Sequence, residues 1–494
     1  MTATTALETE ITVDVDPGWR MPELPLDPPL AVVPAGVRRL SATYLDTADL
    51  RLLRARVTLR RRTGGPDAGW HLKLPLGDSR LEVRHEVRRP PASVPADLAA
   101  LVRSRTRGET LAPVAVLRTT RTVRHVVDAE ARVLAEVVDD RVVAHRPGTP
   151  AERWREVEVE LVAGDRELLD AVVAALLAAG ARPAASQSKL ARVLAGDLAT
   201  PAGSDPPRTA GDVVLAYLAA QVAEVVDRDP QVRLDLPDAV HRQRVAVRRL
   251  RATLATYRRL LEADAVERLR GELRWWGAVL GAVRDAEVLR ERLLGAVADL
   301  PDPHRGIGAD VLRTALDAEL ATSRAALLSE LDGTRYLALL DALVVLVDTP
   351  PWRGRARKPP AAVHPGVRRA VRRVRRALRS ARRAPVGPAL DTSLHDARKA
   401  AKAARYAAES VAALAGKPAS RLAERLTKVQ DSLGAHQDSL VARSRLADLA
   451  ALAVADGRPT GTLDALVALE RERHGDGTAA LGAVRALTPD GWRG

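Results

Sequence analysis

Apolar and polar residues alternate with a period of two through roughly the first 195 residues and follow a helical period beyond about residue 209. A period of two predicts β-strands with one apolar and one charged face. Helices are expected only for PADLAALVRSR and for residues 166–179 in this part. The strand segments read LETEITVDV, TYLDTADLRLLRA, VTLRRRTGG, WHLKLPL, LEVRHEVRRP, VAVLRTTRTVRHVVD, VLAEVVDDRVV and WREVEVELV.

The second part of the chain is predicted to be an all-α bundle, because amphipathic stripes rich in Ala and Leu dominate it. The stretch GDLATPAGSDPPRTAG, residues 196–211, has no apolar periodicity and is expected to be a linker. A second break, TPPWRGRARKPPAAVHPG at residues 349–366, contains five prolines. We therefore expect two domains, residues 1–195 and 212–494, in an α+β protein.

The helical part contains an internal duplication. HRQRVAVRRLR and HDARKAAKAAR carry matching residues 154 positions apart, and LGAVRDAEV and LGAHQDSLV match at an offset of 153. Such a repeat predicts two copies of one helical unit, at about residues 212–345 and 363–485.

Each copy carries a basic ladder. His241, Arg244, Arg248 and Arg251 follow at steps of three, four and three, which places them on one face of a helix. Neighbouring like charges repel and destabilise the helix, so a bound anion that neutralises them would remove this repulsion. A solvated face is the alternative for any one basic helix, but the repetition favours a site for a linear polyanion. The second ladder consists of His395, Arg398, Lys402 and Arg405.

A further basic stripe opens the second copy, with Arg368, Arg372, Arg375, Arg379 and Arg382 on one face. Two interpretations stay open for it: a solvated surface and a second phosphate track.

The composition points to acidic partners. The formal net charge is +14, the sequence pI is about 10.7, and 46% hydrophobic residues suffice for a core. There is no Cys, which excludes thiolate metal sites, and aromatics make up 2%, which leaves few side chains for base stacking. Without a secretory signal or a long apolar run, we expect a cytoplasmic protein with no membrane partner.

The charged strand faces separate into acidic triplets and basic pairs. Carboxylates suit Mg²⁺ or Mn²⁺, and Arg and Lys suit phosphate oxygens. An antiparallel sheet with one wet face would also explain any single strand, whereas strands with charged faces turned inward can close into a barrel with a polar lumen.

Residues 6 to about 195 resemble a CYTH domain, the triphosphate tunnel family. The resemblance lies in Glu8 and Glu10 of the opening motif and in LRRRTGG, WHLKLP, LAEVVDDRV, WREVEVEL and SKLAR, in family order. It implies an eight-stranded antiparallel tunnel that binds triphosphate with a divalent metal, Mg²⁺ or Mn²⁺. The family's E-x-E-x-K motif ends here in Thr12. This leaves two alternatives: a metal-dependent inorganic triphosphatase, and a tunnel that binds without turnover.

The resemblance also implies roles for particular residues. Glu8, Glu10 and Lys73 would be catalytic. The phosphate contacts would come from Arg60, Arg62, Lys73, Arg118, Arg121 and Lys189, and the metal ligands from Glu8, Glu10, Glu136, Asp139, Glu156, Glu158 and Glu160.

Residues 209 to about 450 resemble a CHAD domain, a conserved-histidine α-helical bundle of two four-helix repeats that binds inorganic polyphosphate. The implied ligands are His241, Arg244, Arg248, Arg249, Arg251, His395, Arg398, Lys399, Lys402 and Arg405. Asp285 and Asp438 of the matched LG segments are expected to orient these cations or cap helices, and Trp275 and Trp276 to lie in the core.

The predicted function is polyphosphate binding by the helical domain, joined to a tunnel that binds and hydrolyses triphosphate-type substrates. Two alternatives remain. One is a non-catalytic scaffold of polyphosphate granules, with which the protein would then associate. The other is a basic nucleic-acid or ribosome-associated protein, which the scarcity of aromatics and the absence of a known recognition motif disfavour.

Overall fold

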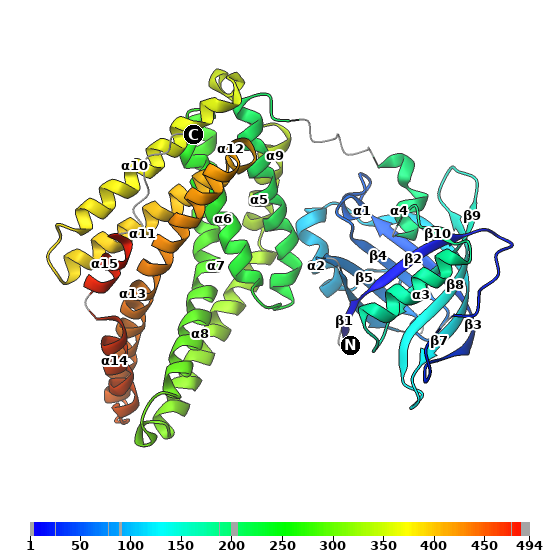
Figure 1. Cartoon of the computed structure of the whole chain (residues 1–494), viewed down its shortest axis with the longest axis horizontal. Coiled ribbons are helices and arrows are strands. Elements are labelled where there is room, and N and C mark those ends of the chain that lie inside the picture. Colours follow the sequence, from blue (N-terminus) through cyan, green and yellow to red (C-terminus); the bar gives the residue numbers. More distant parts are fainter. Residues whose placement is uncertain are drawn as a thin grey trace. The chain divides into compact units, whose positions relative to one another are not determined.

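The computed structural model describes residues 4–24, 26–77, 79–87, 91–186, 188–198, 206–475 and 477–485. The chain divides into two compact units, residues 1–203 and 204–494, one built on a sheet and one on helices (Figure 1). Among the helices of these residues, none is both long and apolar enough to cross a membrane.

The first unit is a ten-stranded antiparallel sheet in the order β1-β6-β5-β4-β3-β7-β8-β9-β2-β10. The α+β fold prediction is confirmed, although ten strands replace the predicted eight. The strands are β1 (Thr4–Glu8), β2 (Glu10–Val15), β3 (Ala31–Asp46), β4 (Thr58–Thr63), β5 (Gly69–Leu76), β6 (Ser79–Glu86), β7 (Ala112–Val127), β8 (Val133–His145), β9 (Glu152–Leu161) and β10 (Arg182–Pro183).

The N-terminal strand closes this sheet into a tunnel. It is interrupted at Thr9, so β1 pairs with β6 while β2 pairs with β9 at the other end of the sheet. Glu8 therefore lies opposite Arg80, and Glu10 lies opposite Glu160. The interrupted N-terminal strand is counted as two strands, β1 and β2, and the two-residue β10 adds one more. These two additions explain why the sheet has ten strands where eight were predicted.

The two faces of the strands have different neighbours. Outward-facing valines of β2, β8 and β9 pack against Leu169, Val172 and Leu176 of α3 (Arg166–Ala178). Inside, apolar residues of β3, β7 and β8 pack against Leu190 and Val193 of α4 (Lys189–Val193). The lumen is thus apolar where α4 packs. Two more helices, α1 (Arg51–Arg54) and α2 (Ala96–Thr106), and the 3₁₀ turn η1 (Ala195–Asp197) complete the unit.

Two sequence expectations change, and the end of a third predicted segment lies outside the described residues. The segment TYLDTADLRLLRA ends β3 and then forms α1, since Asp46 accepts hydrogen bonds from the backbone N–H groups of Leu52 and Leu53. The predicted linker overlaps η1 and the start of α5, and its residues 199–205 lie outside the described residues. The end of LEVRHEVRRP, residues 88–90, also lies outside them.

The second unit contains two similar sets of helices (Figure 1). Its main core includes Leu250, Leu273, Trp276 and Leu426, and Trp275 packs against that core. A smaller core joins the distal ends of α7, α8, α13 and α14. The helices are α5 (Ala210–Arg233), α6 (Ala239–Thr256), α7 (Ala263–Val297), α8 (Ile307–Asp332) and α9 (Thr334–Asp348), then α10 (His364–Ala381), α11 (Pro388–Glu409), α12 (Ala412–Ala415), α13 (Lys417–Ala455), α14 (Gly461–His474) and α15 (Thr478–Arg485).

Candidate functional site

The tunnel of the first unit holds a cavity of about 240 Å³ with a mostly charged wall. Alternate residues of each strand point to the same side of the sheet, so charges from many strands meet there. Most of the predicted tunnel residues lie on its wall. The charged and phenolic lining is Glu8, Glu10, Arg38, Tyr44, Arg60, Arg62, Asp67, Lys73, Arg80, Arg84, Arg121, Glu136, Glu158, Glu160 and Lys189.

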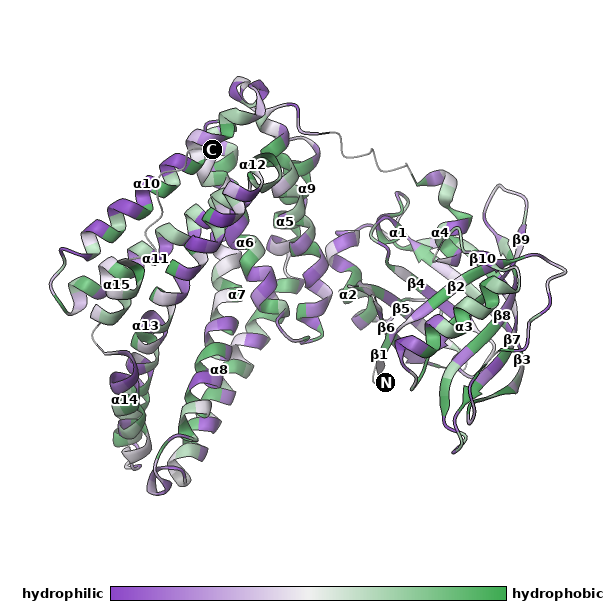
Figure 2. Cartoon of the chain, viewed as in Figure 1, coloured by the Kyte–Doolittle hydropathy of each residue, from purple (hydrophilic) through white to green (hydrophobic). Residues whose placement is uncertain are grey.

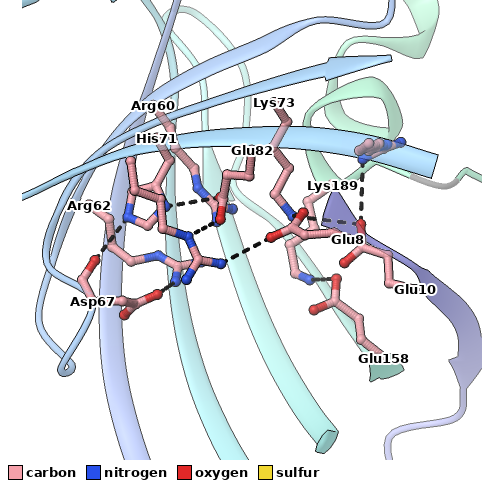
Figure 3. Close-up of polar contacts among 12 residues, drawn as sticks. Glu8, Glu10, Arg60, Arg62, Asp67, His71, Lys73, Glu82, Glu158 and Lys189 are labelled. Carbon is pink, nitrogen blue, oxygen red and sulfur yellow. Dashed lines mark hydrogen bonds and ion pairs between the residues drawn. The ribbon is translucent and has the colours of Figure 1, made fainter. Parts of the chain in front are cut away.

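Lys73 of β5 binds the two glutamates of the N-terminal strand. Its Nζ lies 2.6 Å from Glu8 Oε2 and 3.7 Å from Glu10 Oε1 (Figure 3). Burial lowers the pKa of Lys73, but Glu10, Glu8 and Glu82 outweigh burial and leave that pKa raised. Arg80 and Arg84 approach the same glutamates, at 3.5 Å from Glu10 and 3.1 Å from Glu8. Lys73 therefore stays a cation between two carboxylates.

Glu82 of β6 is a fully buried anion that sequence reasoning did not include. Glu82 Oε1 lies 3.0 Å from His71 Nδ1 and 3.8 Å from Arg60 Nη2 (Figure 3). The same carboxylate also makes a short contact with Arg84. Burial raises the pKa of Glu82, but His71, Lys73 and Arg60 lower it far more. The alternation of LEVRHEVRRP had placed Glu82 on the charged face, which was the signal for it.

Arg62 and Tyr44 form another part of the wall. Arg62 pairs with Asp67 of the turn between β4 and β5, and burial together with nearby Arg60 lowers the pKa of Arg62 to about 10. Arg60 Nη1 lies 3.3 Å from the Tyr44 hydroxyl. Burial raises the pKa of Tyr44, but Arg60, Lys189 and Arg62 outweigh it and leave that pKa lowered. A ligand here would meet two guanidinium groups beside a phenol.

On the opposite wall, Lys189 lies within a group of three carboxylates. Its Nζ is 3.1 Å from Asp140 and 2.6 Å from Glu156, and it also contacts Glu158. Each of these acids offers one oxygen within 4.8 Å of the others, a spacing that could hold a metal ion. Arg121 adds three hydrogen bonds of 2.6–2.8 Å to Asp140 and Glu158. Here two cations already neutralise the acids.

Lys189 reaches this place because of how α4 begins. Ser188 is the N-cap residue, and its hydroxyl accepts a hydrogen bond from the Ala191 N–H. The buried Leu190 and Val193 anchor the helix in the apolar end of the tunnel. Lys189, the first residue of the helix, is thus positioned beside the acids by packing and capping.

Glu160 differs from the other acids, because it makes no salt bridge to any residue that the structure describes. Burial first, and then the charges of Glu8, Glu10 and Glu158, raise the pKa of Glu160 to about 7. It lies opposite Glu10 on one side and Glu136 on the other. Glu8 and Glu10 share Lys73, but Glu160 adds a carboxylate that no described cation neutralises, and carboxylates are typical donors for Mg²⁺ or Mn²⁺. This part of the wall therefore fits a divalent ion.

Thr12 occupies the position where the motif departs from the CYTH family pattern. It is buried on β2 and pairs directly with Glu158 of β9. Glu158 already contacts Lys189 and Arg121, which hold its pKa well below the usual range despite burial. The acid facing position 12 therefore has cationic partners although Thr12 supplies none.

Two predicted residues point away from the cavity. Arg118 is exposed, whereas its neighbours Leu117 and Thr119 line the wall. Asp139 instead pairs with Arg155, at 2.7 and 2.8 Å. From the sequence, Arg118 is expected to share one face of a strand with Arg121, and Glu136 with Asp139. The residues of each pair are three positions apart, so they face opposite sides of the sheet. Asp140 takes the inward place that was assigned to Asp139.

In the helical unit, the two predicted ladders converge between α6 and α11. Burial lowers the pKa of Arg248, and Arg244, Arg405 and Arg398 lower it further against the opposing effect of Tyr406. Burial likewise lowers the pKa of Lys402 to about 7, with further lowering from Arg398, Arg248 and Arg244. The cations of each ladder therefore act electrostatically on those of the other.

Arg248 and Lys402 have no carboxylate partner among the residues that the structure describes. Their neighbours do: Arg244 Nη1 lies 2.9 Å from Asp285, and Arg398 Nη1 lies 3.4 Å from Asp438. As expected from the repeat, these two aspartates orient the cations. The centre of the group is left with uncompensated positive charge.

The matched LG segments explain how the arginines are accommodated. A Cβ at Gly281 would lie 3.4 Å from Arg244 Nη2, and one at Gly434 would lie 3.1 Å from Arg398 Nη2. Glycine lets each guanidinium lie against the next helix, and the aspartate one turn further on receives it. We conclude that both copies build the same arginine cradle.

The two histidines lie in different surroundings. His241 is half-buried, and burial and nearby Arg284 and Arg248 lower its pKa. His395 is exposed, with Nδ1 2.9 Å from Gln437 Oε1. Arg284 and Gln437 occupy matched positions of the two repeats, 153 residues apart. His241 is therefore favoured as a neutral hydrogen-bonding group.

The remaining predicted ligands are spread more widely. Arg249 and Arg405 both pair with Glu409, at 2.9 and 3.2 Å. Arg251 has Arg274 and Arg270 of α7 as its charged neighbours. Lys399 is exposed and pairs with Asp396 at 2.9 Å. It follows Arg398 by one residue, and one residue along a helix turns the side chain by about 100° away from the face that Arg398 occupies. The structure therefore does not bring Lys399 into the central group.

Comparison with known proteins assigns both units. A CYTH domain matches residues 30–193 and a CHAD domain matches residues 216–447. An uncharacterized protein of Mycobacterium tuberculosis, MT2285 in strain CDC 1551 and Rv2226 in strain H37Rv, is 36% identical over 458 residues, or 88% of this chain and 87% of the relative.

Two solved structures resemble the helical unit less closely. PptA from Streptomyces chartreusis is 25% identical with a TM-score of 0.46, covering 57% of this chain and 99% of that one. The CHAD domain from the plant Ricinus communis is 24% identical with a TM-score of 0.46, covering 58% and 97%.

Proposed function

Since the chain belongs to the family of proteins that join a CYTH domain to a CHAD domain, we propose that its helical unit binds inorganic polyphosphate and its tunnel hydrolyses triphosphate-type substrates with a divalent metal. The observation that carries the first part is the central cation group of α6 and α11. Its middle members, Arg248 and Lys402, are partly buried and unpaired within the described part of the chain.

A linear phosphate polymer suits this group. Arg244, Arg248 and Arg398 offer planar donors for bidentate hydrogen bonds to phosphate oxygens, and Lys402 offers a point charge. Buried like charges raise the free energy of the unliganded site, so a bound polyanion is stabilised by relief of that repulsion. The aspartates beside Arg244 and Arg398 keep the guanidinium groups oriented without neutralising the centre.

In the tunnel, the chain supplies both kinds of group that phosphoanhydride hydrolysis needs. Arg60, Arg62, Lys73 and Arg121 would hold the phosphate oxygens in the cavity. Glu8, Glu10 and Glu160 would hold a divalent ion, which when bound neutralises phosphate charge. The acids of the cavity would orient the attacking water, and positioning with electrostatic stabilisation supplies most of the catalysis.

The Lys189 cluster is the second acidic group of the wall, and we assign it a different role. Its three acids all have cationic partners, Lys189 and Arg121, whereas Glu160 has no salt-bridge partner among the described residues, so we place the ion beside Glu160. We propose that Lys189 instead shifts toward bound phosphate, which Tyr44 and Arg60 adjoin.

Thr12 favours one other function for the tunnel. Without the cation that the family motif carries at this position, the tunnel would bind its ligand and turn over slowly. The protein would then be a polyphosphate-binding scaffold.

The helical proposal is tested by measuring affinity of the full chain for polyphosphate at fixed salt. Changing Arg248 and Lys402 together to Gln removes two charge-assisted contacts of roughly 1.5–3 kcal/mol each, so affinity should fall at least about 100-fold. The charge-matched control is Lys399→Gln/Arg473→Gln, which removes two exposed cations that already have partners and should change affinity less than about twofold. Equal losses in both variants would show that binding depends only on net charge.

The tunnel is tested by phosphate release from inorganic triphosphate with and without Mg²⁺ or Mn²⁺. Metal-dependent release that the Glu8→Gln/Glu10→Gln variant loses, and that Arg118→Gln retains, supports hydrolysis. Binding of triphosphate without release would identify the tunnel as the binding module of a scaffold.

A further inference from the structure

The positive charge of this protein is concentrated in one segment. Residues 349–390 contain thirteen of the 77 Lys and Arg residues and none of the 63 Asp and Glu residues. The rest of the chain is left with 64 basic and 63 acidic side chains, so it is close to neutral. Nearly all of the formal net charge of +14 therefore resides in 42 residues.

Seven of these thirteen basic residues lie on α10, and five of the seven are exposed. The helix buries Val367, Val371, Val374 and Leu378 against the bundle and carries seven arginines, most of them exposed. Figure 2 shows the hydrophilic colour recurring along α10. We call the exposed residues Arg368, Arg372, Arg373, Arg376 and Arg379 the α10 arginine face.

The α10 arginine face is not neutralised by the fold. None of its five residues forms a salt bridge with a carboxylate within the described part of the chain. Exposed arginines elsewhere in the unit do, such as Arg290 with Asp317 at 2.5 Å and Arg473 with Asp299 at 2.7 Å. Repulsion along α10 is therefore uncompensated in the free protein.

Two more arginines stand next to this face. Burial, Arg259, Arg372 and Arg258 all lower the pKa of Arg369, which places the end of α6 beside α10. Arg258 and Arg259 are both exposed. The positive surface thus continues from α10 onto a neighbouring element.

The duplicated architecture shows that the fold itself does not need this charge. Helix α5 opens the first repeat as α10 opens the second, and both bury an apolar face in the same core. Yet α5 contains four acidic residues and two arginines, whereas α10 contains seven arginines and no acid. Packing works with either charge, so the arginines of α10 need another explanation.

The side chains on and around the α10 arginine face indicate which kind of anion would bind to it. All large apolar side chains of α10 are buried, so nothing on its face could insert into a lipid bilayer. Residues 364–383 contain no Trp or Tyr on which the bases of a single strand could stack. What the face offers is a row of guanidinium groups from Arg368 to Arg379, about 16 Å long at roughly 1.5 Å per residue.

This face is separate from the central cation group. The charged groups that shift the pKa values of Arg248 and Lys402 lie on α6, α11 and α13, and none lies on α10. A short phosphate chain bound between α6 and α11 would leave the α10 arginine face uncovered. A long chain held at the first site would be present near the second at high effective concentration.

We propose that the α10 arginine face is a second binding track for inorganic polyphosphate, engaged only by chains long enough to reach it from the central group. The inference rests on the proposed function of that group. It assigns chain-length selectivity to α10: the central group binds any chain, and α10 retains long ones.

The test compares short polyphosphate of about ten phosphates with long polyphosphate of several hundred, both binding to the full chain. Changing Arg372, Arg376 and Arg379 together to Gln should lower affinity for the long chains at least tenfold. It should reduce the salt dependence of that binding and leave affinity for short chains within about twofold. Gln is a good helix former and these positions are exposed, so the fold is retained.

A charge-matched control removes three arginines that already have partners: Arg290→Gln/Arg335→Gln/Arg473→Gln should leave long-chain affinity within about twofold. Long-chain affinity that is unchanged in the α10 variant, or lost equally in both triple variants, would overturn the second track. The same holds if a duplex DNA of about 20 base pairs depends on α10 while long polyphosphate does not. Failure of the wild-type chain to bind short polyphosphate would instead refute the function of the central group.

Discussion

The tunnel and the helical unit both gather many cations, but they neutralise them differently. In the tunnel, Lys73 and Lys189 each contact two or three carboxylates. In the helical unit, the charges of neighbouring arginines lower the pKa of Arg248 and Lys402, and carboxylates form salt bridges with the arginines beside them. The pKa shifts have opposite signs for the same reason: both tunnel lysines have a raised pKa, and Lys402 has a lowered one.

This difference indicates two modes of recognition. A tunnel that neutralises itself is stable when empty, and it must rearrange its ion pairs to accept a phosphate and a metal together. A site with unpaired cations is under electrostatic strain when empty, and any polyanion relieves that strain. The first arrangement suits selective chemistry on a small substrate, and the second suits retention of a polymer.

The largest expected effect comes from removing a tunnel cation. Lys189→Met leaves Asp140, Glu156 and Glu158 buried with only Arg121 among them, and breaking a buried ion pair typically destabilises by about 3–5 kcal/mol. Thermal unfolding of the full chain should show the sheet unit melting well below its wild-type temperature. Added Mg²⁺ should restore part of the loss, because the vacated carboxylates can hold an ion. A variant as stable as the wild type would show that Lys189 does not neutralise these acids.

The equivalent substitution in the helical unit should stabilise the fold rather than destabilise it. Lys402→Met removes a partly buried cation on which burial and three arginines outweigh the one nearby carboxylate, Asp438. The free energy of unfolding should therefore rise by about 1–2 kcal/mol at pH 6. The folded pKa of about 7 lies below the unfolded value. Wild-type stability therefore increases from pH 7 toward pH 10, and the gain from the variant shrinks over that range. Denaturant titrations at pH 6 and pH 9 check both sign and slope.

The contrast between the two lysines also shows what could be read from the sequence. Alternation predicted that charged side chains face the lumen, and the offsets of 154 and 153 predicted that Asp285 and Asp438 serve the arginines. To choose Asp140 over Asp139, one must know which alternate residues of β8 face the lumen. Counting in steps of two from Glu136 gives Asp140.

Other features depend on tertiary contacts that local patterns do not contain. The closure of the tunnel by a strand broken at Thr9, the pairing of Arg249 with Glu409, and the exposure of Lys399 depend on how distant elements pack. The unpaired state of Arg248 is likewise a property of the assembled bundle, because its neighbours Arg244 and Arg398 lie 154 residues apart in the sequence.

A tenfold effect on binding is expected from pH. If polyphosphate binds the central cation group as proposed, it binds the protonated form of Lys402, and the pKa of about 7 leaves half of these side chains neutral near pH 7 in the free protein. Affinity should thus fall about tenfold between pH 6 and pH 8 at constant ionic strength. Lys402→Arg keeps the charge at every pH and should flatten the profile. If the wild-type and Lys402→Arg profiles coincide, another group, such as His241, controls the pH dependence.

The smallest effect concerns Glu160, which has no salt-bridge partner among the residues that the structure describes. Burial and the charges of Glu8, Glu10 and Glu158 raise the pKa of Glu160 to about 7, above its unfolded value. Its ionisation therefore lowers stability as pH rises through 7, and Glu160→Gln should raise the melting temperature of the sheet unit by a few degrees at pH 8 and hardly at pH 5.

Metal ions should reverse that effect in the wild type. Mg²⁺ needs the ionised carboxylate, so the melting temperature should rise on adding Mg²⁺ at pH 8 more than at pH 6, and Glu160→Gln should abolish the difference. If the Gln variant still gains the full Mg²⁺-dependent increase, the ion is held by the Lys189 cluster instead. The two acidic groups of the tunnel would then exchange their assigned roles.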